Sequence, residues 1–217
     1  MHQDESVFKK TLNLRKSIGF LLVSLAFQQS LWAAPTPSPD AEIRERLNAN
    51  YTPAYTLSLE EAYGPGMTSE GGGEAIENMF KGIALKDKKM LDIGSGLGGV
   101  SLYLAEKHDA IVTGVEINPW MIEESTKRIP NPLKSRLTYT LMGEGNRLPF
   151  PDASFDIVYS KGVLTHVPDK TPLMNEIFRV LKPKGILVVD DWLSPVRGQW
   201  GAKLNKMAET EGLILFA

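Results

Sequence analysis

The sequence contains no cysteine, which excludes disulfide bonds, thiol nucleophiles and thiolate metal sites. Histidine is scarce: its three copies, at positions 2, 108 and 166, are too scattered to indicate a metal site. The net charge is only −2 at pH 7, and no basic and aromatic stripe occurs, so we expect no nucleic-acid partner. The 217 residues, 42% of them apolar, suffice for one α/β domain with a hydrophobic core.

The first part of the chain differs in composition from the rest. A basic stretch at residues 9–16 precedes an apolar run at residues 18–27, and two small residues, Ala33 and Ala34, follow. This order is typical of a secretory signal peptide, and the run extended through Ala34 would make a marginal membrane anchor. We expect residues 1–34 to form one of these, with an amphipathic surface helix as the alternative, and membrane contact only through this segment.

The remaining chain is expected to form a linker and one domain. Prolines at positions 35, 37 and 39 predict a stiff, proline-rich linker over residues 35–42. Within the domain, residues 43–217, the first part (43–82) combines short helical patterns with glycine-rich turns at 64–66 and 71–73. Because such turns are mobile, we expect a helical lid there that closes over a bound ligand, followed by a core over residues 83–217.

In the expected core, apolar strand patterns alternate with amphipathic helix patterns. Strand patterns cover residues 89–93, 110–115, 137–141, 155–159 and 186–189, and helix patterns cover about 74–80, 100–108 and 173–181. This alternation predicts an α/β fold with a doubly wound, mostly parallel sheet flanked by helices. Ligands of such sheets bind at the carboxyl ends of the strands.

The most informative motif is the glycine-rich turn that follows the strand at residues 89–93. Glycine lacks a Cβ atom, so Gly94 and Gly96 would let the backbone approach a ligand, and Gly98 and Gly99 would let the next helix begin close to the sheet. The N-terminus of that helix offers free N–H groups to an electron-rich ligand group. The motif predicts a loop that binds a nucleotide-type cofactor.

Asp92 bears on which cofactor binds. Gly94, Gly96 and Gly99 satisfy the pattern G-x-G-x-x-G, so a dinucleotide remains a formal alternative. A carboxylate two residues before Gly94 would repel a pyrophosphate, whereas it would attract the ammonium group of S-adenosylmethionine, which has no phosphate. Asp92 therefore favours S-adenosylmethionine.

Glu116 ends the next strand pattern, twenty-four residues after Asp92. At the carboxyl end of a neighbouring parallel strand, its two oxygens could accept hydrogen bonds from both ribose hydroxyls of the cofactor. The alternative is a solvated acidic residue at a strand end.

Four strings in this order resemble the successive motifs of class I S-adenosylmethionine-dependent methyltransferases: LDIGSGLGG, TGVEIN, LPFPDASFDIVYS and LKPKGILVVDDW. The resemblance covers the chain from about residue 88 to 192, and it implies a Rossmann-like fold and S-adenosyl-L-methionine as the cofactor. More narrowly, NYTPAYTLSLEEAYGPGMTSEGG, followed by LDIGSGLGGVSLYLAEK and SKGVLTHV, resembles the phosphoethanolamine and glycine/sarcosine type of small-amine N-methyltransferase. The implied partner is a small-molecule methyl acceptor, an amine first, with quinone, sterol-like or other lipid acceptors as alternatives.

The resemblance also implies roles for individual residues. It places Asp92 and Gly94 at the methionine end of the cofactor and Glu116 with Ile117 around the ribose. Glu144 falls where the family has an aspartate that accepts from the adenine amino group, with Gly145 beside the ring. Thr68 and Ser69 match the lid loop over the cofactor, with helix N-capping as the alternative.

Tyr51 and His166 match a lid tyrosine and a histidine after the fourth strand that act together in the phosphobase enzymes. An amine needs a free lone pair to attack the cofactor's methyl group. An imidazole, with an ordinary pKa near ~6.5, can remove the amine's proton, and a tyrosine hydroxyl can orient it or exclude water. The alternative is that His166 caps the loop before Pro168 and that Tyr51 packs on the core.

Some features depart from the resembled enzymes. Gly162 stands where they carry an acidic residue, and Lys161 replaces an arginine.

The fold of the resembled enzymes continues with an antiparallel strand pair, whereas this sequence ends soon after a helix-like stretch at 199–211. We expect a truncated strand pair, begun by residues 213–216, and an exposed sheet edge prone to association. A catalytically impaired S-adenosylmethionine-binding protein is therefore an alternative. S-adenosylmethionine is made in the cytoplasm, so an exported protein would lack its cofactor. The sequence therefore does not decide in which compartment the protein works.

Overall fold

The computed structural model describes residues 39–143, 147–192, 201–203 and 205–206. The predicted signal peptide or anchor at residues 1–34 lies outside the described residues and stays a prediction, as does the truncated C-terminal strand pair. Two predicted cofactor residues, Glu144 and Gly145, also lie outside them. Within the described ranges, no helix combines the length and the apolar character needed to cross a bilayer.

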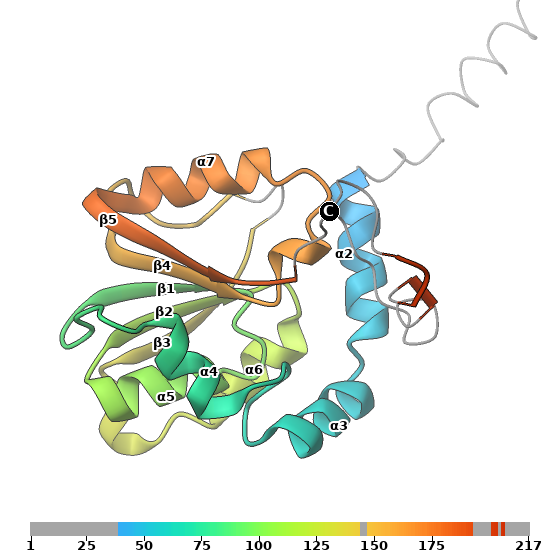
Figure 1. The fold of residues 1–217 in the computed structure, drawn as a ribbon, viewed down its shortest axis with the longest axis horizontal. Coiled ribbons are helices and arrows are strands. Elements are labelled where there is room, and N and C mark those ends of the chain that lie inside the picture. The colour runs from blue at the N-terminus through green and yellow to red at the C-terminus, as the bar shows by residue number, and fades with distance from the viewer. Residues whose placement is uncertain (1–38, 144–146, 193–200, 204, 207–217) are drawn as a thin grey trace, which may run out of the picture. The chain divides into compact units, whose positions relative to one another are not determined.

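Five parallel strands form one sheet in the described part of the chain, in the order β3-β2-β1-β4-β5 (Figure 1). The strands are β1 (Lys89–Ile93), β2 (Ile111–Glu116), β3 (Leu137–Leu141), β4 (Phe155–Lys161) and β5 (Leu181–Asp190). In the central strand β1, Met90 pairs with Val112 of β2 on one side and with Ile157 of β4 on the other. The strand order reverses beside β1, and ligands of open α/β sheets bind outside the carboxyl ends of the strands at such a point.

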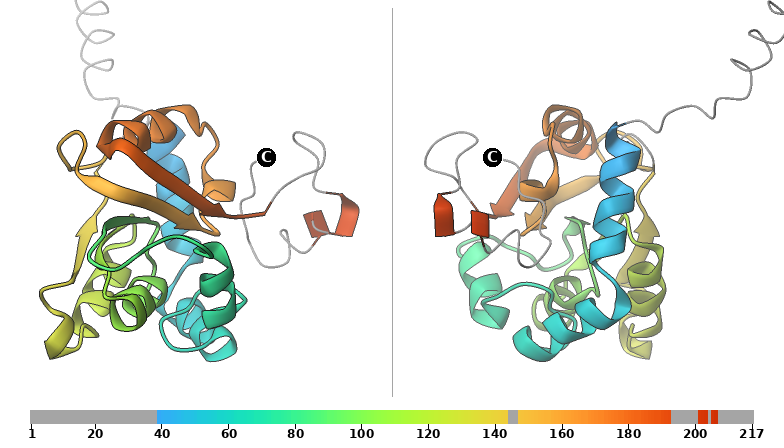
Figure 2. Two further views of the ribbon diagram at one scale, coloured as in Figure 1. Left: turned by 60° about the vertical axis from the view of Figure 1, so that its left-hand side comes forward. Right: turned by 90° about the vertical axis from the view of Figure 1, so that its right-hand side faces the viewer.

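Helices cover both faces of this sheet (Figures 1 and 2). One face carries α4 (Gly72–Met79), α5 (Gly99–His108) and α6 (Pro119–Lys127), and the other carries α7 (Thr171–Val180). Alternate strand residues point to opposite faces: Met90 and Val112 join the apolar core beneath α4 and α5, and Leu91 joins the core beneath α7. The predicted doubly wound α/β fold is confirmed.

Element boundaries follow the sequence patterns closely, except at β5. The strand predicted at 137–141 is confirmed, and β4 extends two residues beyond the predicted 155–159. β5 begins at Leu181, five residues before the predicted start at Ile186. Its pairing with β4 is irregular between Phe155 and Ile157, and Lys184 has a φ angle of +67°. This irregularity carries β5 across a proline and a glycine that interrupt the apolar pattern.

The lid contains two longer helices, α2 (Pro39–Asn50) and α3 (Pro53–Tyr63). The predicted linker at 35–42 is therefore wrong for residues 39–42, which belong to α2. Proline is compatible with the first turn of a helix, where its missing N–H has no intrahelical partner, so Pro39 begins the helix. α3 begins after Thr52, whose hydroxyl accepts a hydrogen bond from the backbone N–H of Tyr55 at 3.3 Å. Short 3₁₀ helices lie at η1 (Asn131–Leu133) and η3 (Leu164–His166).

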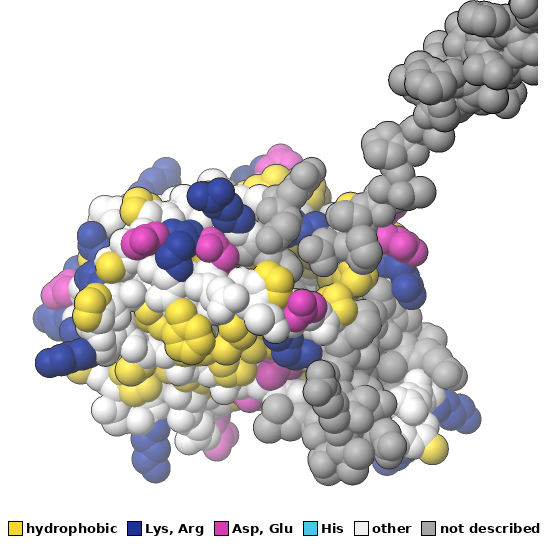
Figure 3. Space-filling view, turned by 90° about the horizontal axis from the view of Figure 1, so that it is seen from above, with side chains coloured by type: hydrophobic (Ala, Val, Ile, Leu, Met, Phe, Trp, Pro, Cys, Tyr) yellow, Lys and Arg dark blue, Asp and Glu magenta, His cyan; other side chains and the backbone are white. Residues whose placement is uncertain are grey.

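Within the described sheet, β5 has a neighbouring strand on one side only. Apolar side chains gather on the face seen from the α7 side in Figure 3. The exposed large apolar residues of α7, β5 and the residues that follow are Phe178, Ile186, Val189 and Trp192. Whether this edge associates with another chain stays a prediction.

Candidate active site

One large cavity lies at the carboxyl ends of β1, β2 and β4, and α2 and the loop before α4 form part of its wall. Its empty space is about 1070 Å³, part of it continuous with solvent, and it is a concave site at the strand ends, where small ligands of α/β sheets bind. Eight of the eleven residues predicted for catalysis or cofactor binding line this one cavity: Tyr51, Thr68, Ser69, Gly94, Gly96, Glu116, Ile117 and His166.

The glycine-rich loop is shaped by close contacts within the chain. Gly94 and Gly96 have φ angles of +73° and +52°, a region that favours glycine. A Cβ atom on Gly94 would lie 2.4 Å from the side chain of Val163, and one on Gly96 would lie 3.2 Å from Oγ1 of Thr68. These glycines therefore let the lid and the segment after β4 come close to the loop. The sequence analysis predicted only that they let a ligand come close.

Asp92 does not line the cavity. Its side chain is 3% exposed, and its Oδ2 accepts a hydrogen bond of 2.7 Å from the Ser101 hydroxyl of α5. The pKa of the Asp92 carboxyl is raised to about 7, chiefly because burial disfavours the charged form, while the hydrogen bond from Ser101 opposes the rise. The geometry therefore gives Asp92 a partner inside the chain, and a direct contact with the cofactor ammonium stays a prediction.

Glu116 lies at the end of β2, 8% exposed. Its Oε2 accepts from the N–H of Gly96 at 2.9 Å, and its Oε1 accepts from the N–H groups of Ile117 and Asn118 at 2.7 and 3.0 Å. Burial raises its pKa, and the three backbone hydrogen bonds oppose this rise. The solvated alternative is wrong, because this carboxylate is buried and connects the glycine loop to the start of α6.

The lid loop carries Thr68 and Ser69 into the cavity wall. Neither caps a helix: α4 begins after Gly71 without a side-chain cap, so the capping alternative is wrong. The Ser69 hydroxyl accepts a hydrogen bond of 3.0 Å from Lys161 Nζ, which also donates to the Glu70 carbonyl at 2.8 Å. The Lys161 side chain is 9% exposed and lies 3.7 Å from Asp190. This lysine therefore connects the lid loop to the ends of β4 and β5.

Tyr51 and His166 meet at the cavity although 115 residues separate them. The Tyr51 hydroxyl lies 3.4 Å from Nε2 of His166, and the two rings meet edge to face with centroids 6.1 Å apart. Burial is the main cause that raises the pKa of Tyr51 to about 12. The Tyr51 hydroxyl thus stays protonated at physiological pH, and it can donate to Nε2 or accept from Nε2–H according to the tautomer of His166.

Two residues that the sequence analysis did not single out position this pair. Oδ2 of Asp191 accepts from the N–H groups of Val163, Leu164 and Thr165, at 3.0, 2.7 and 3.3 Å, just before His166. Nδ2 of Asn118 donates to the Tyr51 carbonyl at 3.2 Å. The adjacent acidic residues in LVVDDW were the only sequence signal for Asp191, since its partners lie more than twenty-five residues away.

Arg44 of α2 binds the chain at the end of β3. Its guanidinium donates to the carbonyls of Met142 and Gly143 at 3.3 and 2.6 Å. These carbonyls directly precede Glu144 and Gly145, for which the resemblance implies adenine contacts. Arg44 therefore fixes the lid helix beside the chain segment expected to hold the adenine ring.

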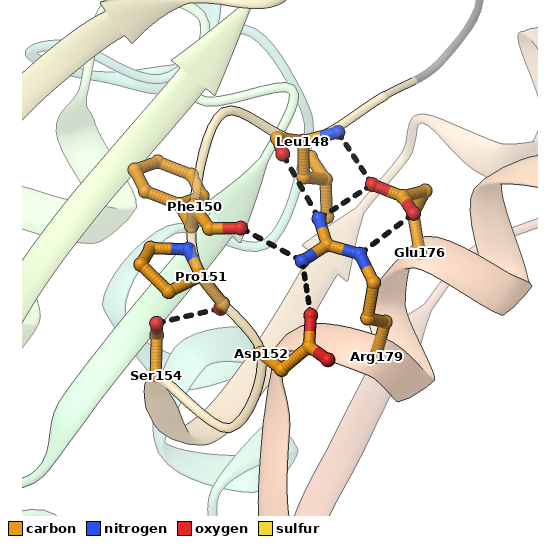
Figure 4. A network of polar contacts seen from close by, with 7 residues as sticks. All are labelled: Leu148, Phe150, Pro151, Asp152, Ser154, Glu176 and Arg179. Atoms are coloured by element: carbon orange, nitrogen blue, oxygen red, sulfur yellow. Dashed lines mark hydrogen bonds and ion pairs between the residues drawn. The ribbon is translucent and has the colours of Figure 1, made fainter.

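The connection from β3 to β4 is held by Arg179 of α7 (Figure 4). The five N–H groups of its guanidinium reach acceptors on both chain segments. These acceptors are the carboxylates of Glu176 and Asp152 and the carbonyls of Leu148 and Phe150, at 2.7 to 3.0 Å. The Arg179 hydrogen bond lowers the pKa of Glu176 to about 2. The string LPFPDASFD is thus a structural motif that fixes the loop leading into β4.

The cavity suits S-adenosylmethionine better than a dinucleotide. Glu116 is the only carboxylate among the described lining residues, and it lies against the glycine loop where a pyrophosphate would bind. A hydroxyl-rich ribose complements this carboxylate, whereas a diphosphate would be repelled by it. Buried Asp92, behind the same loop, adds to this preference whenever it is ionised.

Comparisons with known proteins agree with this interpretation. Residues 91–189 match the family model described as "Methyltransferase domain". The chain is 30% identical over 197 residues to phosphoethanolamine N-methyltransferase 1 of Zea mays, with 88% of this chain and 39% of that protein covered. It is 40% identical over 103 residues to 2-methyl-6-phytyl-1,4-hydroquinone methyltransferase of Synechocystis sp., with 48% of this chain and 31% of that protein covered.

A solved structure extends the likeness to three dimensions. Phosphoethanolamine N-methyltransferase 2 of Haemonchus contortus, in complex with phosphomonomethylethanolamine and S-adenosylhomocysteine, superposes with a TM-score of 0.70 at 25% identity. The alignment covers 81% of this chain and 41% of that one, so the chain spans about two fifths of the length of these phosphoethanolamine relatives. By motifs, fold and comparisons, the chain belongs to the class I S-adenosylmethionine-dependent methyltransferases.

Proposed function

We propose that this chain transfers a methyl group from S-adenosylmethionine to the nitrogen of a small-molecule amine. The observation that carries the proposal is the contact between the Tyr51 hydroxyl and Nε2 of His166, 3.4 Å apart on the wall of the cofactor cavity. A general base must lie within hydrogen-bond reach of the proton that it removes. Both side chains border the cavity where an acceptor would enter.

S-adenosylmethionine, when bound, supplies an electrophilic methyl group. His166 takes the proton that an ammonium acceptor must lose before its nitrogen has a free lone pair. The Tyr51 hydroxyl, kept protonated by burial, orients the imidazole by accepting a hydrogen bond from its Nε2–H, which makes Nδ1 the basic nitrogen that takes the proton. The lid loop, attached through Ser69 to Lys161, restricts water from the reacting groups.

The charges on the cavity wall support an acceptor with an acidic group. Lys161 lines the cavity beside Gly162, where the resembled enzymes carry an acidic side chain. Lys161 has only Asp190, 3.7 Å away, as a carboxylate partner among the described residues. A phosphate or carboxylate on the acceptor would complement this charge. Phosphoethanolamine and sarcosine carry such groups, whereas ethanolamine does not.

A second candidate is methylation of a hydroquinone. The apolar wall formed by Val163, Val167, Pro168 and Leu173 favours it, and so does the similarity to the Synechocystis hydroquinone enzyme. A neutral ring would need no counter-charge from the cavity. This candidate predicts little dependence on Lys161.

A labelled-methyl assay with the full chain separates these candidates. We expect transfer from S-adenosylmethionine to phosphoethanolamine or sarcosine, slower transfer to ethanolamine, and none to a prenylated hydroquinone. Transfer to the hydroquinone alone would establish the second candidate. Calorimetric binding of S-adenosylmethionine without transfer to any acceptor would instead identify a catalytically impaired binding protein.

A further inference from the structure

The lid loop that carries Thr68 and Ser69 into the cofactor cavity is attached to the rest of the chain at both of its ends. Lys161 holds one end through the Ser69 hydroxyl. Glu60 of α3 holds the other end, because its Oε1 accepts a hydrogen bond of 2.7 Å from the backbone N–H of Gly66. The first attachment borders the cofactor cavity, whereas Glu60 is not among the described residues that line it.

The Glu60 carboxylate is itself fixed by a cation. Nη1 of Arg128, the residue that follows α6, donates to the same Oε1 at 2.6 Å. Nη2 of Arg128 lies 3.8 Å from Oε2 of Glu124, one helical turn earlier. The side chains of Glu60 and Arg128 are 20% and 31% exposed, so water screens this ion pair only in part. Since Arg128 already orders the carboxylate, less side-chain entropy is lost when it accepts from Gly66.

The turn at residues 64–66 connects this attachment to the glycine-rich cofactor loop. The Gly66 carbonyl accepts a hydrogen bond of 3.0 Å from the N–H of Gly99, the first residue of α5. The sequence analysis expected N–H groups at this helix start to serve a ligand, and this one is occupied by the chain itself. The two backbones touch, because a Cβ atom on Gly66 would lie 2.7 Å from Cα of Gly99. Gly66 therefore joins lid helix α3 to α5 through both of its polar backbone groups.

The turn reaches the cofactor cavity through Thr68, two residues beyond Gly66. Thr68 lines the cavity together with Gly96, and a Cβ atom on Gly96 would lie 3.2 Å from Oγ1 of Thr68. Glu60 and Arg128 line a separate cavity, together with Gly66. These two charged residues can therefore act on the cofactor only through the position of the lid loop.

We propose that Glu60 and Arg128 are positioning residues for the cofactor. Together they hold the turn at Gly66 against α5, and so keep the lid loop closed over bound S-adenosylmethionine. Without the carboxylate, the Gly66 N–H would bind water, and the open arrangement of the loop would gain population. A ligand that needs the closed arrangement then has a lower apparent affinity. The inference goes beyond the proposed function, because it concerns the cofactor and is independent of the acceptor.

Calorimetry and dissociation kinetics with S-adenosylhomocysteine test the proposal on the full chain. Glu60→Ala removes the acceptor of the Gly66 N–H. It should weaken binding roughly tenfold, close to the lower end of the range for a hydrogen bond to a charged group, with most of the loss in the dissociation rate. Glu60→Gln keeps an acceptor oxygen for the same N–H and should recover most of the affinity. Arg128→Met leaves the carboxylate in place and should weaken binding less than Glu60→Ala.

Amide hydrogen exchange locates the effect in the lid loop. With S-adenosylhomocysteine bound, residues 66–69 should exchange faster in Glu60→Ala than in the wild type or in Glu60→Gln. A wild-type dissociation constant in folded Glu60→Ala would overturn the proposal. Equal losses of affinity in Glu60→Ala and Glu60→Gln would overturn it as well, and so would unchanged exchange of these residues.

Lys127→Ala provides the matched control. Lys127 forms ion pairs with Glu123 and Glu124 on α6, next to Arg128, and is not among the described residues that line the cofactor cavity. This variant should bind S-adenosylhomocysteine like the wild type. Should Glu60→Ala not fold, Arg128→Met carries the same test, and binding equal to that of Lys127→Ala would contradict the proposal.

Discussion

At the scale of single residues, the chemistry of the site depends on groups removed from water. Tyr51, Asp92 and Glu116 all have raised pKa values because burial disfavours their charged forms. For Tyr51 this preserves a protonated hydroxyl beside His166. For Asp92 it leaves the protonation state sensitive to pH near neutrality.

Replacement of His166 by alanine should lower methyl transfer to an amine by about 10²- to 10⁴-fold, the usual contribution of a general base. Binding of S-adenosylhomocysteine should remain within about twofold of wild type, because the proposed role concerns the acceptor's proton. Steady-state kinetics and calorimetry on the same preparation would measure both quantities. A wild-type rate across neutral pH in the variant would remove His166 from the mechanism.

The pKa of Asp92, raised from 3.8 to about 7, predicts how stability depends on pH. The folded state retains this proton over a range in which the unfolded state has lost it. The contribution of protonated Asp92 to the free energy of unfolding is therefore fully present below pH 3.8 and is lost as the pH rises through about 7. In Asp92→Asn, a neutral side chain keeps an acceptor for Ser101, so this dependence should disappear.

Urea unfolding of both proteins between pH 4 and pH 8 would measure the effect. Relative to Asp92→Asn, the wild type should lose stability across this range, by at most about 4 kcal/mol. A constant difference between the two proteins would show that Asp92 titrates normally in the fold.

At the scale of elements, the strands and helices of the core were predictable because their periodicity is local. The strand at 137–141 and the helices at 100–108 and 173–181 needed only patterns over a few residues. The start of β5 was not predictable, since Pro183 and Gly185 interrupt its pattern and pairing with β4 restores it. Asp191 also escaped prediction, because its role arises from partners distant in sequence.

η3, the short helix that ends in His166, depends on one carboxylate. Asp191→Ala would leave the three N–H groups of Val163, Leu164 and Thr165 without this acceptor, so unfolding should become easier by about 1–3 kcal/mol. Because η3 sets the position of His166, methyl transfer should fall as well. Asp191→Asn retains a carbonyl oxygen and should recover most of both losses. Equal behaviour of the two variants would indicate that the charge, and not the acceptor, matters.

At the scale of the whole molecule, a cofactor that binds only the folded state stabilises it by mass action. S-adenosylhomocysteine at a hundred times its dissociation constant should add about 2.7 kcal/mol to the free energy of unfolding. A nicotinamide dinucleotide at the same concentration should add nothing, because its diphosphate would meet Glu116. Thermal unfolding with each ligand would measure the difference, and a larger shift with the dinucleotide would contradict the cofactor assignment.

The contacts among Gly96, Glu116, Asn118 and Tyr51 form a continuous path from the glycine loop to the lid. The residues expected to bind S-adenosylmethionine therefore also position Tyr51 and His166, the pair proposed to act on the methyl acceptor. Such an arrangement predicts compulsory-order kinetics, in which the donor enters first and its demethylated product leaves last. The product should accordingly compete with the donor and show mixed inhibition against the acceptor.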